Sequence, residues 1–260
     1  MRPTRPTLII VGHGSSTSKA AEVAAREHAE TLRQSNRYGS VLVHFLTGGG
    51  PVPDLPAGEV FILPFFMSEG YFARRKIPEV FGLVSGERHE PERSLYQCDA
   101  LGVDPFLAEI LKQMAGEACR TLGIATGQAH VVLAAHGSKS SGASREAALF
   151  QQGELERIGD FRAVSSFFLE EAPGFEDLMR GRKEDQAPVI VLGLFSAAGP
   201  HASVDVPAAL TAWEQMEKAA GNSTLAEVHY AGVVGVRPEV VRLIQESVTR
   251  RYAAPVRGAK

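Results

Sequence analysis

Two similar segments, 123 residues apart, constrain this chain more than any other feature of its sequence. Residues 8–16 read LIIVGHGSS, and residues 131–139 read VVLAAHGSK. Each is a short apolar run that ends in His-Gly-Ser. Self-similarity at a long, regular spacing indicates a repeated structural unit, and overlooking it would misassign the whole fold. We therefore expect two similar halves rather than one continuous domain.

Four later matches follow in the same order, and their offsets grow only to 133 residues. Small insertions explain that growth. Five ordered matches together indicate an internal duplication. The later pairs are residues 45–47 and 168–170, 62–66 and 191–195, 77–78 and 206–207, and 102–105 and 235–238.

Apolar runs rich in Val, Ile and Leu predict strands that are buried on both faces, as in parallel sheets. Amphipathic helical patterns separate them, and an alternation of strands and helices predicts an α/β fold. We expect two lobes, each with a mainly parallel four-stranded sheet flanked by helices. The expected strands are 7–12, 41–46, 60–66 and 95–98, then 130–135, 163–169, 188–195 and 227–234.

The loop at residues 121–128 predicts the boundary between the lobes. The N-terminal lobe is expected at 1–122, the C-terminal lobe at 129–251, and a flexible tail at 252–260. Each lobe would end in a helix that begins after a proline, at Pro105 or Pro238.

Composition narrows the classes of function. The 260 residues carry a net charge of −3, which favours neither nucleic acid nor an anionic membrane surface. The apolar stretch near the N-terminus is too short for a membrane span. Cys98 and Cys119 match no zinc spacing and suit a reduced cytoplasmic protein. The sequence also lacks the glycine motifs of phosphate loops, dinucleotide folds and α/β-hydrolases, so nothing in it supports ATP- or NAD-driven chemistry.

Three polar residues follow successive strands of the second half: His136, Glu170 and His201. Residues beyond the carboxyl ends of parallel strands converge at one edge of the sheet. Two imidazoles and a carboxylate there would form a three-ligand metal site with open positions. The alternative is that they are ordinary hydrogen-bonded residues at strand ends.

The first half has the same scaffold with different side chains. It keeps His13, but Thr47 corresponds to Glu170 and Phe72 corresponds to His201. One imidazole alone cannot form the same metal site. The first half is therefore expected to carry a degenerate copy.

The three motifs of the second half resemble those of the class II chelatases. These motifs are a strand with His-Gly-Ser, then Phe-Leu-Glu, then Gly-x-His-x-x-x-Asp-[Ile/Val]-Pro. The two-domain sirohydrochlorin cobaltochelatases and ferrochelatases are the most similar group, over residues 7–250. The resemblance implies two lobes with a cleft between them, and a catalytic and metal-binding role for His136, Glu170 and His201. Members of the group usually carry the full set in the N-terminal half, whereas this chain carries it in the C-terminal half.

The resemblance also implies insertion of a divalent metal into sirohydrochlorin without ATP, in cobalamin or sirohaem synthesis. Co²⁺ is the expected metal, with Fe²⁺ or Ni²⁺ as alternatives, and no further cofactor is expected. We expect a cytoplasmic monomer whose partner is the tetrapyrrole substrate. Arg74, Arg75 and Lys76, together with His13, would contact that substrate, unless they form only a solvated basic loop.

Two other functions remain open. A non-catalytic carrier of metal or tetrapyrrole would use the same fold for binding and delivery. A structural paralogue would keep these residues as leftovers. The carboxylate beside two imidazoles favours the enzyme, because a carrier needs no general base.

Overall fold

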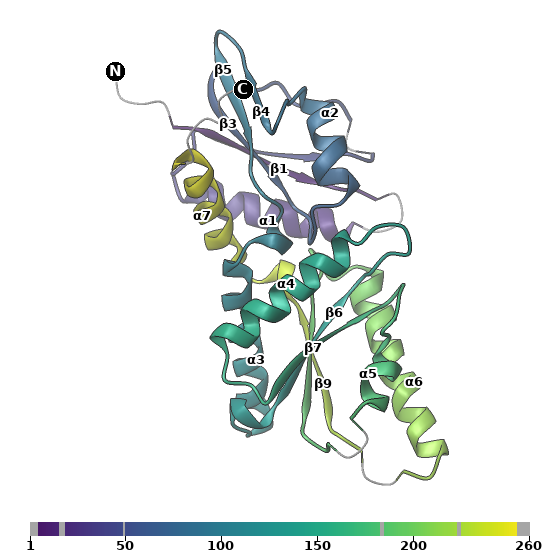
Figure 1. Ribbon diagram of the computed structural model, residues 1–260. Coiled ribbons are helices and arrows are strands. Elements are labelled where there is room, and N and C mark those ends of the chain that lie inside the picture. Colours follow the sequence, from purple (N-terminus) through teal and green to yellow (C-terminus); the bar gives the residue numbers. More distant parts are fainter. Residues whose placement is uncertain (1–4, 16–18, 49, 183–184, 223–224, 254–260) are drawn as a thin grey trace. The chain divides into compact units, whose positions relative to one another are not determined.

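The computed structural model describes residues 5–15, 19–48, 50–182, 185–222 and 225–253 (Figure 1). It divides into two compact units. Unit 1 contains the residues up to 104 and the segment from 238 onward, and unit 2 contains residues 105–237. Each unit has its own sheet with helices beside it, as the alternating pattern predicted.

Unit 1 contains a five-stranded sheet in the order β2-β1-β3-β5-β4. Four strands are parallel, and β4 pairs with β5 in the antiparallel direction. The apolar runs predicted only four strands here. The fifth, β4, has three charged or polar residues and so no apolar run to signal it. The strands are β1 (Thr7–Gly12), β2 (Ser40–Phe45), β3 (Gly58–Pro64), β4 (Glu87–His89) and β5 (Arg93–Gln97).

Unit 2 contains a four-stranded parallel sheet in the order β7-β6-β8-β9. Strand β6 pairs with β7 on one side and with β8 on the other. The prediction of a parallel four-stranded sheet is confirmed for this unit. Its strands are β6 (His130–Ala135), β7 (Ala163–Phe168), β8 (Val189–Gly193) and β9 (Val228–Val233).

Helices accompany both sheets. Unit 1 contains α1 (Ala20–Gln34), α2 (Ile77–Phe81) and α7 (Val240–Ala253); unit 2 contains α3 (Phe106–Leu122), α4 (Ala143–Ile158), α5 (Phe175–Arg180) and α6 (Val206–Ala219). Two π-helical turns, Phe72–Lys76 and His201–Asp205, lead into α2 and α6. Single 3-10 turns lie at Leu101–Val103, Thr126–Gln128 and Val234–Val236. Within the described ranges, no helix has the length and apolar character needed to cross a membrane.

The unit boundaries differ from the expected lobes, 1–122 and 129–251. Helix α3 belongs to unit 2, where it packs against α4, β8 and β9, and α7 belongs to unit 1, where it packs against α1 and β3. Periodicity predicts which face of a helix is buried, but several sheets can cover the same face. The expected tail, 252–260, lies outside the described residues from position 254 onward.

The central strands are buried on both faces, as predicted. Residues 8–11 of β1 and 131–134 of β6 are 0% exposed. Such burial is typical of parallel strands covered by helices on both sides. Polar side chains that could take part in catalysis or binding therefore lie at the ends of these strands.

Candidate active site

The structure brings the three predicted residues of the second half together within unit 2. His136 directly follows β6, Glu170 lies two residues beyond β7, and His201 opens the π turn after β8. Because β6 pairs in parallel with both β7 and β8, these three ends lie at the same edge of the sheet.

The two imidazoles contact each other through equivalent nitrogens. The Nε2 atoms of His136 and His201 lie 3.2 Å apart, and the rings meet at 88° with their centroids 4.4 Å apart. Glu170 Oε1 lies 3.6 Å from His136 Nε2. The side chains of His136, His201 and Glu170 are 39%, 48% and 52% exposed, so a solute can reach all three.

The hydrogen bonds of the other ring nitrogens determine which tautomers are present. His136 Nδ1 lies 2.8 Å from the carbonyl oxygen of Gly137, and His201 Nδ1 lies 2.7 Å from Asp205 Oδ2. A carbonyl or carboxylate oxygen accepts hydrogen bonds, so both Nδ1 atoms are donors and carry the proton. The two facing Nε2 atoms therefore each present a lone pair. Only a shared proton or a cation between them satisfies both.

This nitrogen pair has the spacing of two metal ligands. Metal–nitrogen bonds are about 2.0–2.1 Å long, which places two tetrahedral donors about 3.3 Å apart. The observed 3.2 Å agrees with that separation. Within the described residues, no group of three or more His, Cys, Asp or Glu side chains is already gathered to hold a metal ion. Two donors are thus in place, and Glu170 is a neighbouring carboxylate rather than a preformed third ligand.

A partly buried ion pair holds the loop of His136 against the loop of Glu170. Glu171 Oε1 accepts a hydrogen bond from the Ser138 amide at 3.1 Å, and its Oε2 lies 2.7 Å from Arg145 Nη2. The Arg145 guanidinium also holds the pKa of Glu171 below its usual range. Gly137 adopts a φ of 73°, and a Cβ there would lie 2.8 Å from Glu171 Cγ. Glycine is therefore required in the His-Gly-Ser turn.

Two residues that support this site, Asp205 and Arg145, were not identified as site residues from the sequence. Asp205 belongs to the quoted motif, and its spacing of four residues from His201 was an available signal for the Nδ1 contact. Arg145 lies within α4 and has no local motif, so only the folded chain shows that it reaches Glu171.

Unit 1 repeats this geometry with other side chains. The His13 ring meets the Phe72 ring at 78° with centroids 4.3 Å apart, and His13 Nδ1 contacts the Gly14 carbonyl. The Thr47 amide donates to the His13 carbonyl at 2.8 Å, as the amide of Glu170 donates to the corresponding carbonyl in unit 2 at 3.0 Å. The residues that the sequence repeat pairs therefore occupy equivalent positions in the two units. At these positions unit 1 has one imidazole and no carboxylate.

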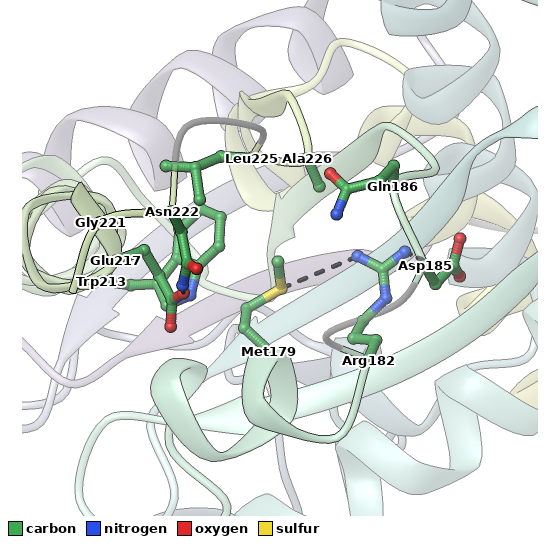
Figure 2. A pocket seen from close by; sticks show the side chains of 10 residues that line it. All are labelled: Met179, Arg182, Asp185, Gln186, Trp213, Glu217, Gly221, Asn222, Leu225 and Ala226. Carbon is green, nitrogen blue, oxygen red and sulfur yellow. Dashed lines mark hydrogen bonds and ion pairs between the residues drawn. The ribbon is translucent and has the colours of Figure 1, made fainter.

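A separate hollow of about 380 Å³ lies in unit 2 beside the segments that precede β8 and β9 (Figure 2). It is thus at the amino ends of these strands, whereas the imidazole pair is at the carboxyl ends. Arg182 donates to Asp185 at 3.0 Å in its wall, and its guanidinium also contacts the Met179 sulfur at 3.8 Å. These polar groups already satisfy one another, so we assign no function to this hollow.

Sequence comparison relates the chain to one family in both of its halves. The CbiX family model matches residues 7–118 and 130–251. A protein of Halobacterium salinarum named as a probable sirohydrochlorin cobaltochelatase is 25% identical over 265 residues, which cover 92% of this chain and 89% of that protein.

Two solved structures show similar folds. One is CbiX, described as the terminal enzyme for biosynthesis of siroheme in denitrifying bacteria; its TM-score is 0.71 at 27% identity, over 96% of this chain and 100% of that one. The other is a multi-domain Deinococcus radiodurans protein with structural similarity to chelatases, with a TM-score of 0.76 at 21% identity. That match covers 98% of this chain, which spans 56% of the longer protein. The resemblance inferred from the motifs is confirmed, and the chain belongs to the CbiX family.

Proposed function

We propose that this protein inserts a divalent metal ion into sirohydrochlorin without ATP, with Co²⁺ as the first candidate metal. The observation that carries the proposal is the facing pair of Nε2 lone pairs in His136 and His201, 3.2 Å apart. Two related proteins support the substrate. One is named as a probable sirohydrochlorin cobaltochelatase, and the other is described as the terminal enzyme for biosynthesis of siroheme.

The chemistry requires a metal donor site and a proton acceptor. A divalent ion that enters the macrocycle displaces two pyrrole N–H protons, while four pyrrole nitrogens replace its former ligands. His136 and His201 hold the ion through Nε2, and incomplete coordination leaves positions open for incoming nitrogens. The Glu170 carboxylate, 3.6 Å from His136 Nε2, accepts one pyrrole proton as general base, and the second passes to an imidazole Nε2 once the metal has left it.

Asp205 keeps His201 in the tautomer that binds metal. Its carboxylate accepts the Nδ1 proton at 2.7 Å, which directs the ring and raises the donor strength of Nε2. The Gly137 carbonyl does the same for His136. Both imidazoles are therefore oriented before the metal arrives.

Imidazole ligands accept Co²⁺, Ni²⁺ and Fe²⁺ alike, and their affinities follow the Irving–Williams order rather than biological need. The site chemistry therefore supports a divalent metal, and the name of the Halobacterium relative supports cobalt. Sirohaem synthesis would require Fe²⁺ at the same residues.

The deciding experiment follows the absorbance of sirohydrochlorin during incubation with Co²⁺, Fe²⁺ or Ni²⁺ under anaerobic conditions. We expect wild-type protein to accelerate at least one insertion over the protein-free rate, and expect His201→Ala to lose most of that acceleration. Binding of both metal and sirohydrochlorin without acceleration would refute the proposal and indicate a delivery protein. Binding of neither would indicate a structural paralogue.

A further inference from the structure

The π turns of both units contain the same break in their backbone hydrogen bonds. A π turn pairs each carbonyl oxygen with the amide five residues later in the chain. For Ala73 in unit 1 that residue is Pro78, and for Ala202 in unit 2 it is Pro207. Proline has no N–H, so neither carbonyl receives its π-helical hydrogen bond. Both alanines are buried, so each carbonyl needs a donor from elsewhere in the protein.

In unit 1 a side chain supplies the missing donor. Gln97, the last residue of β5, donates from Nε2 to the Ala73 carbonyl at 2.8 Å. Because Gln97 pairs with Ile62 of β3, this bond holds the π turn against the sheet. The basic residues 74–76 belong to the same turn, and their expected contact with the substrate stays a prediction.

Tyr230 occupies the equivalent place in unit 2. It pairs with Val191 of β8 as Gln97 pairs with Ile62 of β3, and the sequence repeat matches Val191 to Ile62. A Cβ on Gly193 would lie 2.9 Å from the Tyr230 hydroxyl oxygen, so glycine leaves the room that this side chain needs. Gly193 is the last residue of β8. The hydroxyl therefore lies at the carboxyl end of this strand, beyond which the π turn follows.

The Tyr230 hydroxyl is buried and has no hydrogen-bond partner among the described residues. Burial raises the pKa of Tyr230 to about 12, so the group keeps its proton and can donate at neutral pH. Tyr230 packs against the apolar cluster that contains Val206, the first residue after the π turn. The Val206 amide donates to the His201 carbonyl, not to that of Ala202. Unit 2 thus has an unpaired donor and a carbonyl without its helical donor at the places that are bonded in unit 1.

We propose that Tyr230 is a positioning residue for metal insertion, and that its hydroxyl donates to the Ala202 carbonyl when His201 holds the metal ion. His201 begins the π turn, so a movement of the turn that forms this bond also moves the imidazole. The facing lone pairs of His136 and His201 repel each other until a cation lies between them, so metal binding changes the force on the turn. A bond that is formed only in the metal-bound state raises the affinity for the metal. The inference rests on the proposed function and adds Tyr230 to its site.

The variant Tyr230→Phe tests the inference, because it removes only the hydroxyl. Equilibrium dialysis against Co²⁺ should show binding about three- to tenfold weaker than in wild type, as the loss of one hydrogen bond predicts. Urea unfolding in EDTA, followed by the fluorescence of Trp213 in unit 2, should give a midpoint at least as high as in wild type. The reason is that the hydroxyl has no partner to lose in the metal-free protein. A merely structural tyrosine would show the reverse, with lower stability and unchanged affinity.

The matched control is Tyr38→Phe, which removes a half-buried hydroxyl from unit 1. Burial raises the pKa of Tyr38 to about 12 as well, yet this residue should not affect Co²⁺ binding. Wild-type affinity in Tyr230→Phe, equal weakening in the control, or a lower urea midpoint of Tyr230→Phe in EDTA would each overturn the inference. The proposed function fails separately, if wild type binds Co²⁺ and sirohydrochlorin without accelerating insertion. Wild type that binds no Co²⁺ would overturn both.

Discussion

Replacing His130 with glutamine should remove a large part of the acid sensitivity of unit 2. The imidazole is 4% exposed at the start of β6, and its Nε2 lies 2.8 Å from Ser165 Oγ. Its Nδ1 is buried without a hydrogen-bond partner among the described residues. Burial is the main reason that the pKa of His130 falls from 6.5 to about 4, and the charge of Arg182 lowers the pKa further.

The sign and size of the effect follow from proton linkage. The folded state binds the proton less readily than the unfolded state, so the stability associated with neutral His130 is complete above pH 6.5. It is lost as the pH falls towards 4. The difference between a pKa of 6.5 and one of about 4 corresponds to about 3 kcal/mol in full, and most of that is lost at pH 4.5. The free energy of unfolding of a typical domain is only about 5–15 kcal/mol, so this effect is a large part of it.

Urea unfolding at pH 7.5 and pH 4.5, followed by the fluorescence of Trp213, measures this difference. Trp213 is the only tryptophan of the sequence and is 7% exposed within unit 2. Wild type should lose about 2–3 kcal/mol more unfolding free energy than His130→Gln between the two pH values. Ser165→Ala is the matched control: it should retain the wild-type loss, because burial rather than this hydrogen bond is the main cause. A full wild-type loss in His130→Gln would refute the reasoning.

Four further predictions concern the site. His136→Ala should abolish most metal insertion, because it removes one of the two imidazole donors. His13→Ala removes neither donor and should have a modest effect. The initial rates of sirohydrochlorin absorbance change measure both variants. Glu170→Gln should slow insertion about 10²–10⁴-fold through loss of the general base, yet leave Co²⁺ binding in equilibrium dialysis. Asp205→Asn should weaken Co²⁺ binding about 10–100-fold, because an uncharged amide accepts the Nδ1 proton more weakly than the carboxylate and can donate to Nδ1 instead. Arg145→Met should lower stability in urea by about 1–2 kcal/mol, after allowance for partial exposure, and slow insertion.

Three results would each contradict one of these predictions. An inactive His13→Ala beside an active His136→Ala would place the metal centre in unit 1. Wild-type Co²⁺ affinity in Asp205→Asn would show that the Nδ1 contact does not tune His201. Unchanged stability in Arg145→Met would show that the ion pair with Glu171 is fully offset by solvation.

The repeat and the buried strands were readable from the sequence because both depend on local patterns. An apolar run such as residues 8–11 is typical of a strand buried on both faces of a parallel sheet, and the length of the run indicates the length of the strand. Polar residues that follow parallel strands lie at the same edge of the sheet, so His136, Glu170 and His201 could be predicted to share an edge, and the order β7-β6-β8 makes them neighbours there. The short strand β4, made of charged and polar residues, has no such pattern and was missed.

The sequence alone therefore determined the strands other than β4, the duplicated scaffold and the residues of the candidate site, because side-chain periodicity and strand ends are local properties. Tertiary structure decided what those residues face. A helix with one apolar side can cover any sheet, and only packing assigned α3 to unit 2 and α7 to unit 1. Likewise, no spacing rule connects Arg145 with Glu171, or brings the Nε2 atoms of His136 and His201 together. The Nδ1 partners, Gly137 and Asp205, are local and direct the two Nε2 lone pairs, but only folding places those lone pairs 3.2 Å apart.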